Sequence, residues 1–191
     1  MAPDNDSKSL SEARYAKHAQ AYVSSQSHAQ GYDLERLVEI SNPQPDWEML
    51  DIATGGGHTA LRFAPLVKSV VATDLTENML QAAGQFVRSQ GADHIEFRQA
   101  DAESLPFEDG SFDLVTCRIA AHHFPAVPAF IHESTRVLKT GGVFVLQDHV
   151  LPEQEEAARH VDSFEKQRDP SHNRAFSESE WIDMIDKAGL K

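Results

Sequence analysis

Three carboxylates and a run of glycines stand where they could hold a ligand by hydrogen bonding. Asp51 lies in an apolar segment just before Gly55-Gly56-Gly57, while Asp74 and Asp101 each follow a further apolar segment. Consecutive glycines let the backbone turn sharply and approach a ligand, and the start of a helix offers free N–H groups. A carboxylate can accept hydrogen bonds from two hydroxyls or from an amino group. This chemistry suits a nucleoside that carries a charged tail.

A second group of residues could move a proton. His122 and His123 are adjacent, and Asp148 follows a later apolar segment. Imidazole titrates near neutral pH, so we take these three as candidate catalytic residues without choosing among them. Each has a plain alternative: one histidine facing a substrate is as plausible as simple packing, and Asp148 could cap a turn. Adjacent histidines point in different directions, and no ligand follows them at metal-binding spacing, so we expect no metal.

The helices and strands that must position these residues can be predicted from the periodicity of hydrophobic residues. Short apolar segments alternate with helical patterns, which predicts βαβ units and a parallel sheet covered on both faces. We therefore expect an α/β fold, a Rossmann-like three-layer α/β/α sandwich with a mostly parallel sheet. Ligands bind beyond the carboxyl ends of such strands, where the polar residues above are found. The expected strands are 49–53, 69–73, 94–98, 112–117 and 143–146. Helices are expected at about 10–23, after Gly31, at 59–67, from the cap Thr76 to Gly91, and at 127–138, 153–165 and 178–188.

Composition excludes several classes of protein. The 191 residues suffice for one domain, and the net charge of −13 disfavours nucleic acid as a partner. A single cysteine, Cys117, cannot form an intrachain disulfide or a cysteine-rich zinc site. No stretch approaches the ~20 apolar residues of a membrane span, so we expect no membrane insertion and a cytoplasmic location.

The glycine run leaves two cofactors open. Residues 55–60 fit the dinucleotide pattern G-x-G-x-x-A, with Asp74 in place of the ribose-binding acid. Asp51, however, interrupts a strand that is normally apolar throughout, and Asp101 is suited to an adenine amino group. A hydride-transfer motif such as Tyr-x-x-x-Lys is missing after the fourth strand. The three carboxylates favour an adenosine with a cationic amino-acid tail.

The chain resembles class I S-adenosylmethionine-dependent methyltransferases of the methyltransferase-11 type, near the UbiE and YcgJ-like subgroup. Each matching segment is weak alone, but they occur in register along nearly the whole chain. The matching segments are 50–57, 72–76, 100–107, 112–115, 118–124, 136–142, 168–172 and 176–181. The resemblance implies methyl transfer from S-adenosyl-L-methionine to a small-molecule acceptor. The alternatives are a non-catalytic adenosyl-cofactor-binding module and, less favoured, an NAD(P)-binding oxidoreductase.

The same resemblance implies roles for individual residues. The glycine loop would approach the methionine portion, Asp74 would hold the ribose hydroxyls, and Asp101 with the N–H of Ala102 would contact adenine. Asp51 orients the cofactor on this interpretation, although it could merely cap the loop. Leu75 and Met79 would pack on the adenosine, and the Arg118 backbone would line the methionine part. The implied cofactor-binding set is Asp51, Ala53, Thr54, Gly55, Gly57, Asp74, Leu75, Met79, Asp101, Ala102 and Arg118.

Two departures from the family pattern bear on these expectations. Ala53 stands where the family has glycine, and the chain ends at Lys191 where the family continues into two more strands. We therefore expect five strands with the C-terminal ones missing, and an outer edge that could pair in a homo-oligomer. The expected organisation is an N-terminal tail and helical lid at 1–40, the cofactor-binding core at 41–150, and a C-terminal helical segment of the same domain at 151–191. Within the lid, the resemblance rests on Tyr22, Ser25, His28, Gly31 and Asp33.

Overall fold

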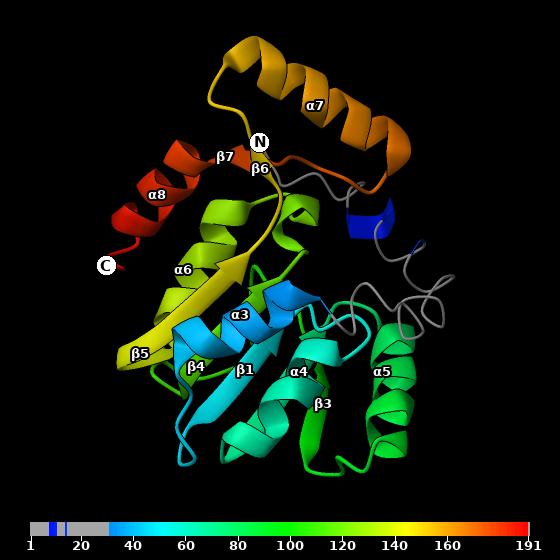
Figure 1. Ribbon diagram of the computed structural model, residues 1–191, viewed down its shortest axis with the longest axis vertical. Coiled ribbons are helices and arrows are strands. Elements are labelled where there is room, and N and C mark those ends of the chain that lie inside the picture. Colours follow the sequence, from blue (N-terminus) through cyan, green and yellow to red (C-terminus); the bar gives the residue numbers. More distant parts are fainter. Residues whose placement is uncertain (1–7, 11–13, 15–30, 191) are drawn as a thin grey trace.

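A five-stranded parallel sheet forms the centre of the protein in a computed structural model (Figure 1), which describes residues 8–10, 14 and 31–190. The strand order is β3-β2-β1-β4-β5, and every neighbouring pair is parallel. The predicted three-layer fold and the five predicted strands are confirmed. The strands are β1 (Glu48–Ile52), β2 (Ser69–Asp74), β3 (Ile95–Gln99), β4 (Phe112–Arg118) and β5 (Leu138–Gln147).

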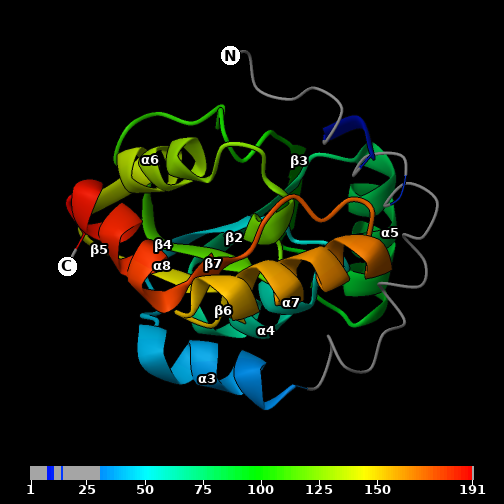
Figure 2. The ribbon, with the colours of Figure 1, turned by 90° about the horizontal axis from the view of Figure 1, so that it is seen from above.

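Alternating side chains of the strands supply two apolar layers. Met49 and Leu114 face one layer, while Leu50 and Val115 face the other. Helices α3 (Tyr32–Ser41), α4 (His58–Phe63) and α5 (Glu77–Ser89) cover the first layer, and α6 (Val127–Val137) and α8 (Glu178–Lys187) cover the second. Figure 2 shows α6 and α3 on opposite sides of the sheet. Both faces of the sheet are therefore buried, as the uniformly apolar strands require.

Strand β5 begins earlier than the sequence indicated. It starts at Leu138 rather than at Val143, and its pairing with β4 shifts register between Phe112 and Leu114. Gly142 lies in this irregular stretch, where an added Cβ would come within 2.9 Å of the Asp113 carbonyl oxygen. The two glycines therefore belong to a bulged strand that passes close to its neighbour, and do not form a turn before it.

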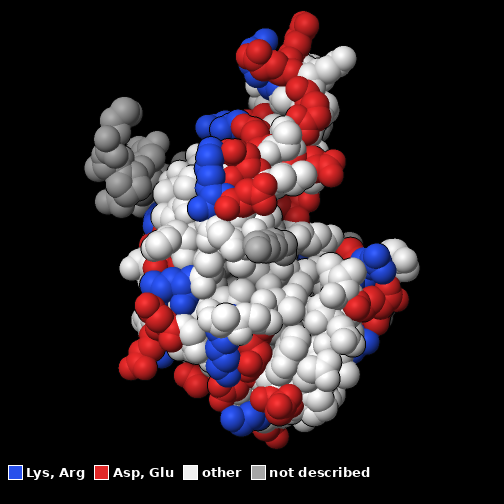
Figure 3. Space-filling model, turned by 90° about the vertical axis from the view of Figure 1, so that its left-hand side faces the viewer, with Lys and Arg blue, Asp and Glu red and all other residues white. Residues whose placement is uncertain are grey.

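The C-terminal segment crosses above the carboxyl ends of the strands (Figure 1). Strand β6 (Val150–Leu151) pairs in parallel with β7 (Phe176–Ser177), and α7 (Glu155–Arg168) lies between them in sequence. No residue of α7 is buried, and Figure 3 shows charged side chains gathered along this helix at the top of the view. In contrast, Trp181 of α8 is buried in the same apolar cluster as Phe130 of α6.

The structure describes only part of the N-terminal region. Of the proposed lid, Tyr22, Ser25 and His28 lie outside the described residues, whereas Leu34 and Leu37 of α3 are buried in the core. Among the described helices, none combines the length and the apolar character that crossing a bilayer requires.

Candidate active site

A pocket opens at the carboxyl ends of β1, β2 and β4, where the strand order reverses. Chain order runs outward from β1 through β2 to β3 and resumes on the other side of β1 with β4. Open parallel sheets bind ligands at this reversal. Every predicted cofactor-binding residue except Gly57 lines the pocket: Asp51, Ala53, Thr54, Gly55, Asp74, Leu75, Met79, Asp101, Ala102 and Arg118.

Asp51 forms the floor of the pocket from inside the sheet. Its carboxylate accepts hydrogen bonds from the hydroxyl of Thr54 at 2.6 Å and of Thr116 at 2.7 Å. The residue is 1% exposed. Burial raises the pKa of Asp51 to about 6, and these hydroxyls and the charge of Arg118 oppose the shift. The carboxylate thus fixes the loop after β1 and contributes negative charge beneath the pocket.

The loop after β1 uses left-handed backbone at three positions. Ala53, Gly55 and Gly57 have φ values of 53°, 54° and 81°. Glycine adopts this region without cost, whereas alanine is strained there, which gives a physical reason for the glycine that the resemblance implies at position 53. Gly57 does not line the pocket and packs against α5. A Cβ added at Gly57 would lie 3.0 Å from the side chain of Val87 in that helix.

Ile119 is a further strained residue that the sequence did not reveal. It follows β4, lines the pocket and has a φ of 53°, which is rare for a β-branched side chain. Its N–H donates to the carbonyl oxygen of Gln147 at 2.7 Å. The strain falls where β4 leaves the sheet, and this turn directs the following residues to the pocket.

Asp74 fastens the glycine loop to the end of β2. One carboxylate oxygen accepts the N–H of Gly55 at 3.1 Å, and the other accepts the N–H and hydroxyl of Thr76 at 3.0 and 3.1 Å. Burial raises the pKa of Asp74, and these donors oppose the shift. A carboxylate oxygen has two lone pairs, so the oxygen that holds Gly55 can accept one more hydrogen bond from a ligand hydroxyl.

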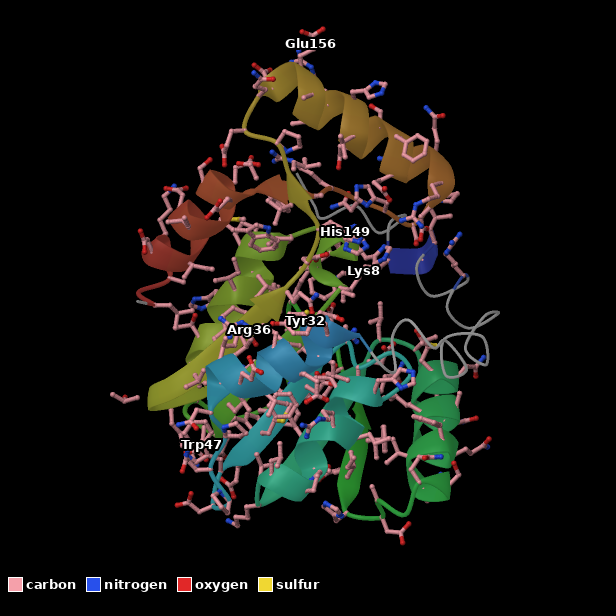
Figure 4. The ribbon with its side chains drawn as sticks, viewed as in Figure 1. Lys8, Tyr32, Arg36, Trp47, His149 and Glu156 are labelled. Atoms are coloured by element: carbon pink, nitrogen blue, oxygen red, sulfur yellow. The ribbon has the colours of Figure 1, made fainter. Side chains whose placement is uncertain are left out.

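Lys8 reaches the pocket at Asp101. Its Nζ lies 2.5 Å from a carboxylate oxygen of Asp101 and 2.5 Å from one of Glu103. The other oxygen of Asp101 accepts the N–H of Glu103. Figure 4 places Lys8 between α7 and the carboxyl ends of the strands. The sequence carried no signal for this contact, because a lysine in a polar N-terminal stretch gives no indication of a partner 93 residues away.

Arg118 joins the N-terminal region to the end of β4 through its side chain. Its Nε and Nη2 donate to one carboxylate oxygen of Asp33 at 2.8 and 2.5 Å. The Arg118 side chain is 5% exposed. The resemblance implied a role only for the Arg118 backbone, whereas the guanidinium also ties Asp33, at the start of α3, to the pocket wall. Burial opposes ionisation of Asp33, but the hydrogen bond and charge of Arg118 lower its pKa.

The two adjacent histidines have different environments. His122 is buried and does not line the pocket, whereas His123 does. Asp148 accepts from the His122 N–H at 2.8 Å and lies 2.5 Å from its ring Nδ1. Burial opposes ionisation of Asp148, yet its hydrogen bond with His122 and the charge there lower its pKa. Asp148 therefore holds His122 from behind the pocket wall.

The predicted histidine pair belongs to a larger cluster. The rings of His149 and His172 lie 4.6 and 5.4 Å from that of His122, between ring centres. Candidate ligand atoms of His122, Asp148 and His149 all lie within 4.8 Å of one another, because β5 ends beside β4. Residue spacing around His122 does not reveal this juxtaposition, because Asp148 and His149 lie 26 and 27 positions further along the chain. However, the His122 and His149 rings stack at 13°, so their in-plane lone pairs do not converge on one point.

A distant segment, Asp169–His172, completes this side of the pocket. The Nδ1 of His123 lies 2.9 Å from the carbonyl oxygen of Ser171. Asp169 accepts the N–H of Ser171 at 2.9 Å and its hydroxyl at 2.6 Å. The N–H groups of Asn173 and Arg174 both donate to the His122 carbonyl oxygen. The resemblance included residues 168–172 but gave them no role, since their contact with His123 spans 48 positions.

The sequence of the chain matches a known protein family. Residues 50–146 match the family of the methyltransferase domain Methyltransf_11. The chain is 41% identical to the uncharacterized methyltransferase YcgJ of Bacillus subtilis over 174 residues. These aligned residues make up 91% of this chain and 69% of YcgJ. The chain is 37% identical to the uncharacterized protein YafE of Escherichia coli, over 70% of the chain and 65% of that protein.

Solved structures agree with the sequence relatives. A protein of Bacillus halodurans described as a methyltransferase superposes with a TM-score of 0.82 at 48% identity, over 83% of this chain and 69% of that one. The B. subtilis YcgJ structure gives a TM-score of 0.80 at 41% identity, over 82% and 67% of the two chains. The chain thus spans about two thirds of the length of these relatives. It belongs to the Methyltransf_11 family of methyltransferase domains.

Proposed function

We propose that the protein transfers a methyl group from S-adenosyl-L-methionine to a small-molecule acceptor. The observation that carries this proposal is the joint placement of Asp74 and Asp101 along one pocket with the loop of Gly55. A carboxylate at the end of β2 suits the ribose hydroxyls, and Asp101, after the neighbouring strand β3, suits the adenine amino group. Asp51 adds negative charge beneath the part of the pocket where a cationic amino-acid tail would lie.

The chemistry requires little covalent participation by the protein. When bound, S-adenosyl-L-methionine supplies a methyl group activated by its sulfonium. The pocket residues then hold donor and acceptor in line and exclude water, which accounts for much of the rate enhancement in such displacements. Phe124 and Pro125 line the pocket beside His123 and offer an apolar wall near the acceptor. On this proposal no metal takes part, and the stacked geometry of His122 and His149 supports that view.

Calorimetric titration tests the cofactor assignment. The full chain is titrated separately with S-adenosyl-L-methionine and with NADH, and we expect heat of binding only with the first. Binding of NADH alone would overturn the proposal in favour of an oxidoreductase. A screen with methyl-labelled cofactor and a panel of small acceptors then separates an enzyme from a binding module. Cofactor binding with no labelled product across the panel and in cell extract would favour the module.

A further inference from the structure

A side chain of the protein itself occupies the adenine end of the pocket. Lys8 lines the pocket, and its Nζ lies 2.5 Å from a carboxylate oxygen of Asp101, the residue proposed to contact the adenine amino group. The other described lining residues all lie between Asp51 and Pro125 in the sequence. On the proposed cofactor assignment, on which the following proposal rests, an ammonium group from the N-terminal stretch therefore holds the place of the adenine amino group.

Lys8 balances the charge of two neighbouring carboxylates. Its Nζ also lies 2.5 Å from an oxygen of Glu103, whose side chain is 7% exposed. The second oxygen of Glu103 accepts the N–H of Ala126, and the second oxygen of Asp101 accepts the N–H of Glu103 at 3.0 Å. Burial opposes the charge of Lys8, but hydrogen bonds to both carboxylates outweigh it and raise its pKa. Each carboxylate thus has one oxygen held by a backbone N–H and one held by the ammonium group.

The pocket must enlarge to take the cofactor. Its volume is about 130 Å³, whereas sites for ligands of this size measure about 300–1,000 Å³. Much of the wall is fixed by the core, in which Asp51 and Met79 are buried. In contrast, none of the described residues 8–10 and 14 is buried. Lys8 is therefore the lining side chain that can move aside with the least loss of packing.

A second ion pair attaches the same stretch to the C-terminal segment. The Nε of Arg14 lies 3.2 Å from a carboxylate oxygen of Asp169, whose side chain is 12% exposed. Ion pairs between partly exposed groups are weak and are screened by salt, so a ligand that supplies another donor can displace Lys8 from Asp101. Because Arg14 keeps this stretch beside the pocket, Lys8 can return to Asp101 after the ligand leaves.

We propose that Lys8 is an internal competitor for adenine: its ammonium group occupies the Asp101 oxygen that the adenine amino group uses, and binding of the cofactor displaces it. The displacement exchanges one donor for another on the same oxygen and involves no covalent step. A protein whose site is occupied part of the time binds its ligand more weakly, so Lys8 lowers the affinity for ligands that carry adenine. The cofactor keeps its adenine after it gives up the methyl group. The return of Lys8 to Asp101 therefore also promotes release of the spent cofactor.

Calorimetric titration with adenosine measures the competition. Lys8→Met keeps a side chain of similar size but removes the charge and the donor, so we expect it to bind adenosine ~3–10-fold more tightly than wild type. Lys8→Arg, which retains a cation, should behave like wild type. Lys187→Met removes a cation that pairs with Asp183 in α8, and it is the matched control. Melting curves check that each variant is folded. Equal or weaker binding of adenosine by Lys8→Met would overturn the proposal.

Salt provides a second measurement on the same proteins. Adenosine is uncharged, so salt changes its binding mainly through the ion pairs of the protein. We expect wild type to bind adenosine more tightly at about 1 M salt than at about 0.1 M, because the higher concentration screens Lys8 from its carboxylates. Lys8→Met should show a clearly smaller change. The same salt dependence in both proteins would overturn the proposal.

Chemical labelling follows the displacement directly in the wild-type protein. Acetic anhydride acetylates uncharged lysine amines, and mass spectrometry of peptides gives the rate at each lysine with and without saturating adenosine. Displacement frees Lys8 from the carboxylates that raise its pKa, so we expect its acetylation to become several-fold faster when adenosine is bound. The rate at Lys187 should not change. An unchanged or slower rate at Lys8 would show that adenosine does not displace it, and would overturn the proposal.

The outcomes separate the competitor role of Lys8 from the proposed function. If wild type binds S-adenosyl-L-methionine but Lys8→Met does not bind adenosine more tightly, the competitor role is wrong and the cofactor assignment stands. If Lys8→Met binds S-adenosyl-L-methionine and wild type does not, both proposals are supported. Failure of both proteins to bind S-adenosyl-L-methionine and adenosine would overturn the proposed function, and the competitor role with it.

Discussion

The two sides of the pocket are built in different ways. The cofactor side is built on strand-end loops with contacts inside one loop, as Asp51 makes with Thr54 and Asp74 with Thr76, and Lys8 and Asp33 join it at Asp101 and Arg118. The acceptor side joins segments that are far apart in the chain: His122 with Asp148, and His123 with Ser171. The first side therefore rests mainly on the strand-end loops of the Rossmann-like fold, whereas the second depends on how the C-terminal segment crosses above the sheet (Figure 1).

This difference predicts that the two sides respond differently to mutation. Changes on the cofactor side should alter cofactor affinity and leave the fold of the C-terminal segment intact. Changes on the acceptor side should alter stability and acceptor use and leave cofactor affinity intact. Figure 4 shows His149 in the region between α7 and the strand ends, where the acceptor side is assembled.

The largest effect on stability is expected from Asp148→Ala. The carboxylate accepts from the backbone N–H groups of His122 and His149 and bonds the His122 ring, and its side chain is 1% exposed. Removing it leaves buried donors unpaired, so we expect a loss of about 3–5 kcal/mol in the free energy of unfolding, measured with urea. Asp148→Asn, which keeps an acceptor oxygen, should lose clearly less. A loss below about 1 kcal/mol for Asp148→Ala would show that the acceptor side is not held together by this group.

On the cofactor side the largest effect is expected from Asp74→Ala. Removal of a carboxylate that accepts ribose hydroxyls should weaken binding of S-adenosyl-L-methionine by about 2–3 kcal/mol, the scale of hydrogen bonds to charged groups. The His123→Asn variant serves as the matched change on the acceptor side and should bind the cofactor normally. Calorimetry measures both, and a melting curve checks that each variant is folded. Equal affinity of Asp74→Ala and wild type would refute the ribose assignment.

The contrast between the two sides also explains what the sequence could and could not predict. The parallel sheet, its five strands and the loops after β1, β2 and β3 followed from apolar periodicity and from glycine and aspartate after each strand. Asp169 and Ser171 received no role, because nothing in the spacing of residues says which distant carbonyl a histidine will meet. Lys8 was missed for the same reason. The early start of β5 was missed because the glycines at 141 and 142 indicate a turn unless a neighbouring strand passes close to them.

Asp51 should give the stability of the protein a measurable pH dependence. Its pKa is raised from 3.8 to about 6 in the folded protein, so between these values the folded state binds more protons than the unfolded state. The contribution to stability is thus full below pH 4 and is lost as pH rises through 6, by on the order of 2–3 kcal/mol. Asp51→Asn should remove this slope. Urea unfolding of both proteins from pH 4 to pH 7 gives the difference, and parallel curves would show that Asp51 titrates normally.

The smallest expected effect is at Ala53, where the family pattern and this chain differ. An L-residue in the left-handed region costs about 1–2 kcal/mol, and glycine escapes that cost while losing about 0.5–1 kcal/mol through the greater freedom of the unfolded chain. Ala53→Gly should therefore stabilise the protein by up to about 1 kcal/mol and leave cofactor affinity within a few-fold. Gly57→Ala is the reverse change, in which the same strain is added to a 3.0 Å contact with Val87, and it should destabilise. If Ala53→Gly instead destabilises the protein by more than about 1 kcal/mol, the packing of the Ala53 methyl group outweighs its backbone strain. Side-chain packing would then stabilise the cofactor loop, as side-chain contacts stabilise the acceptor side.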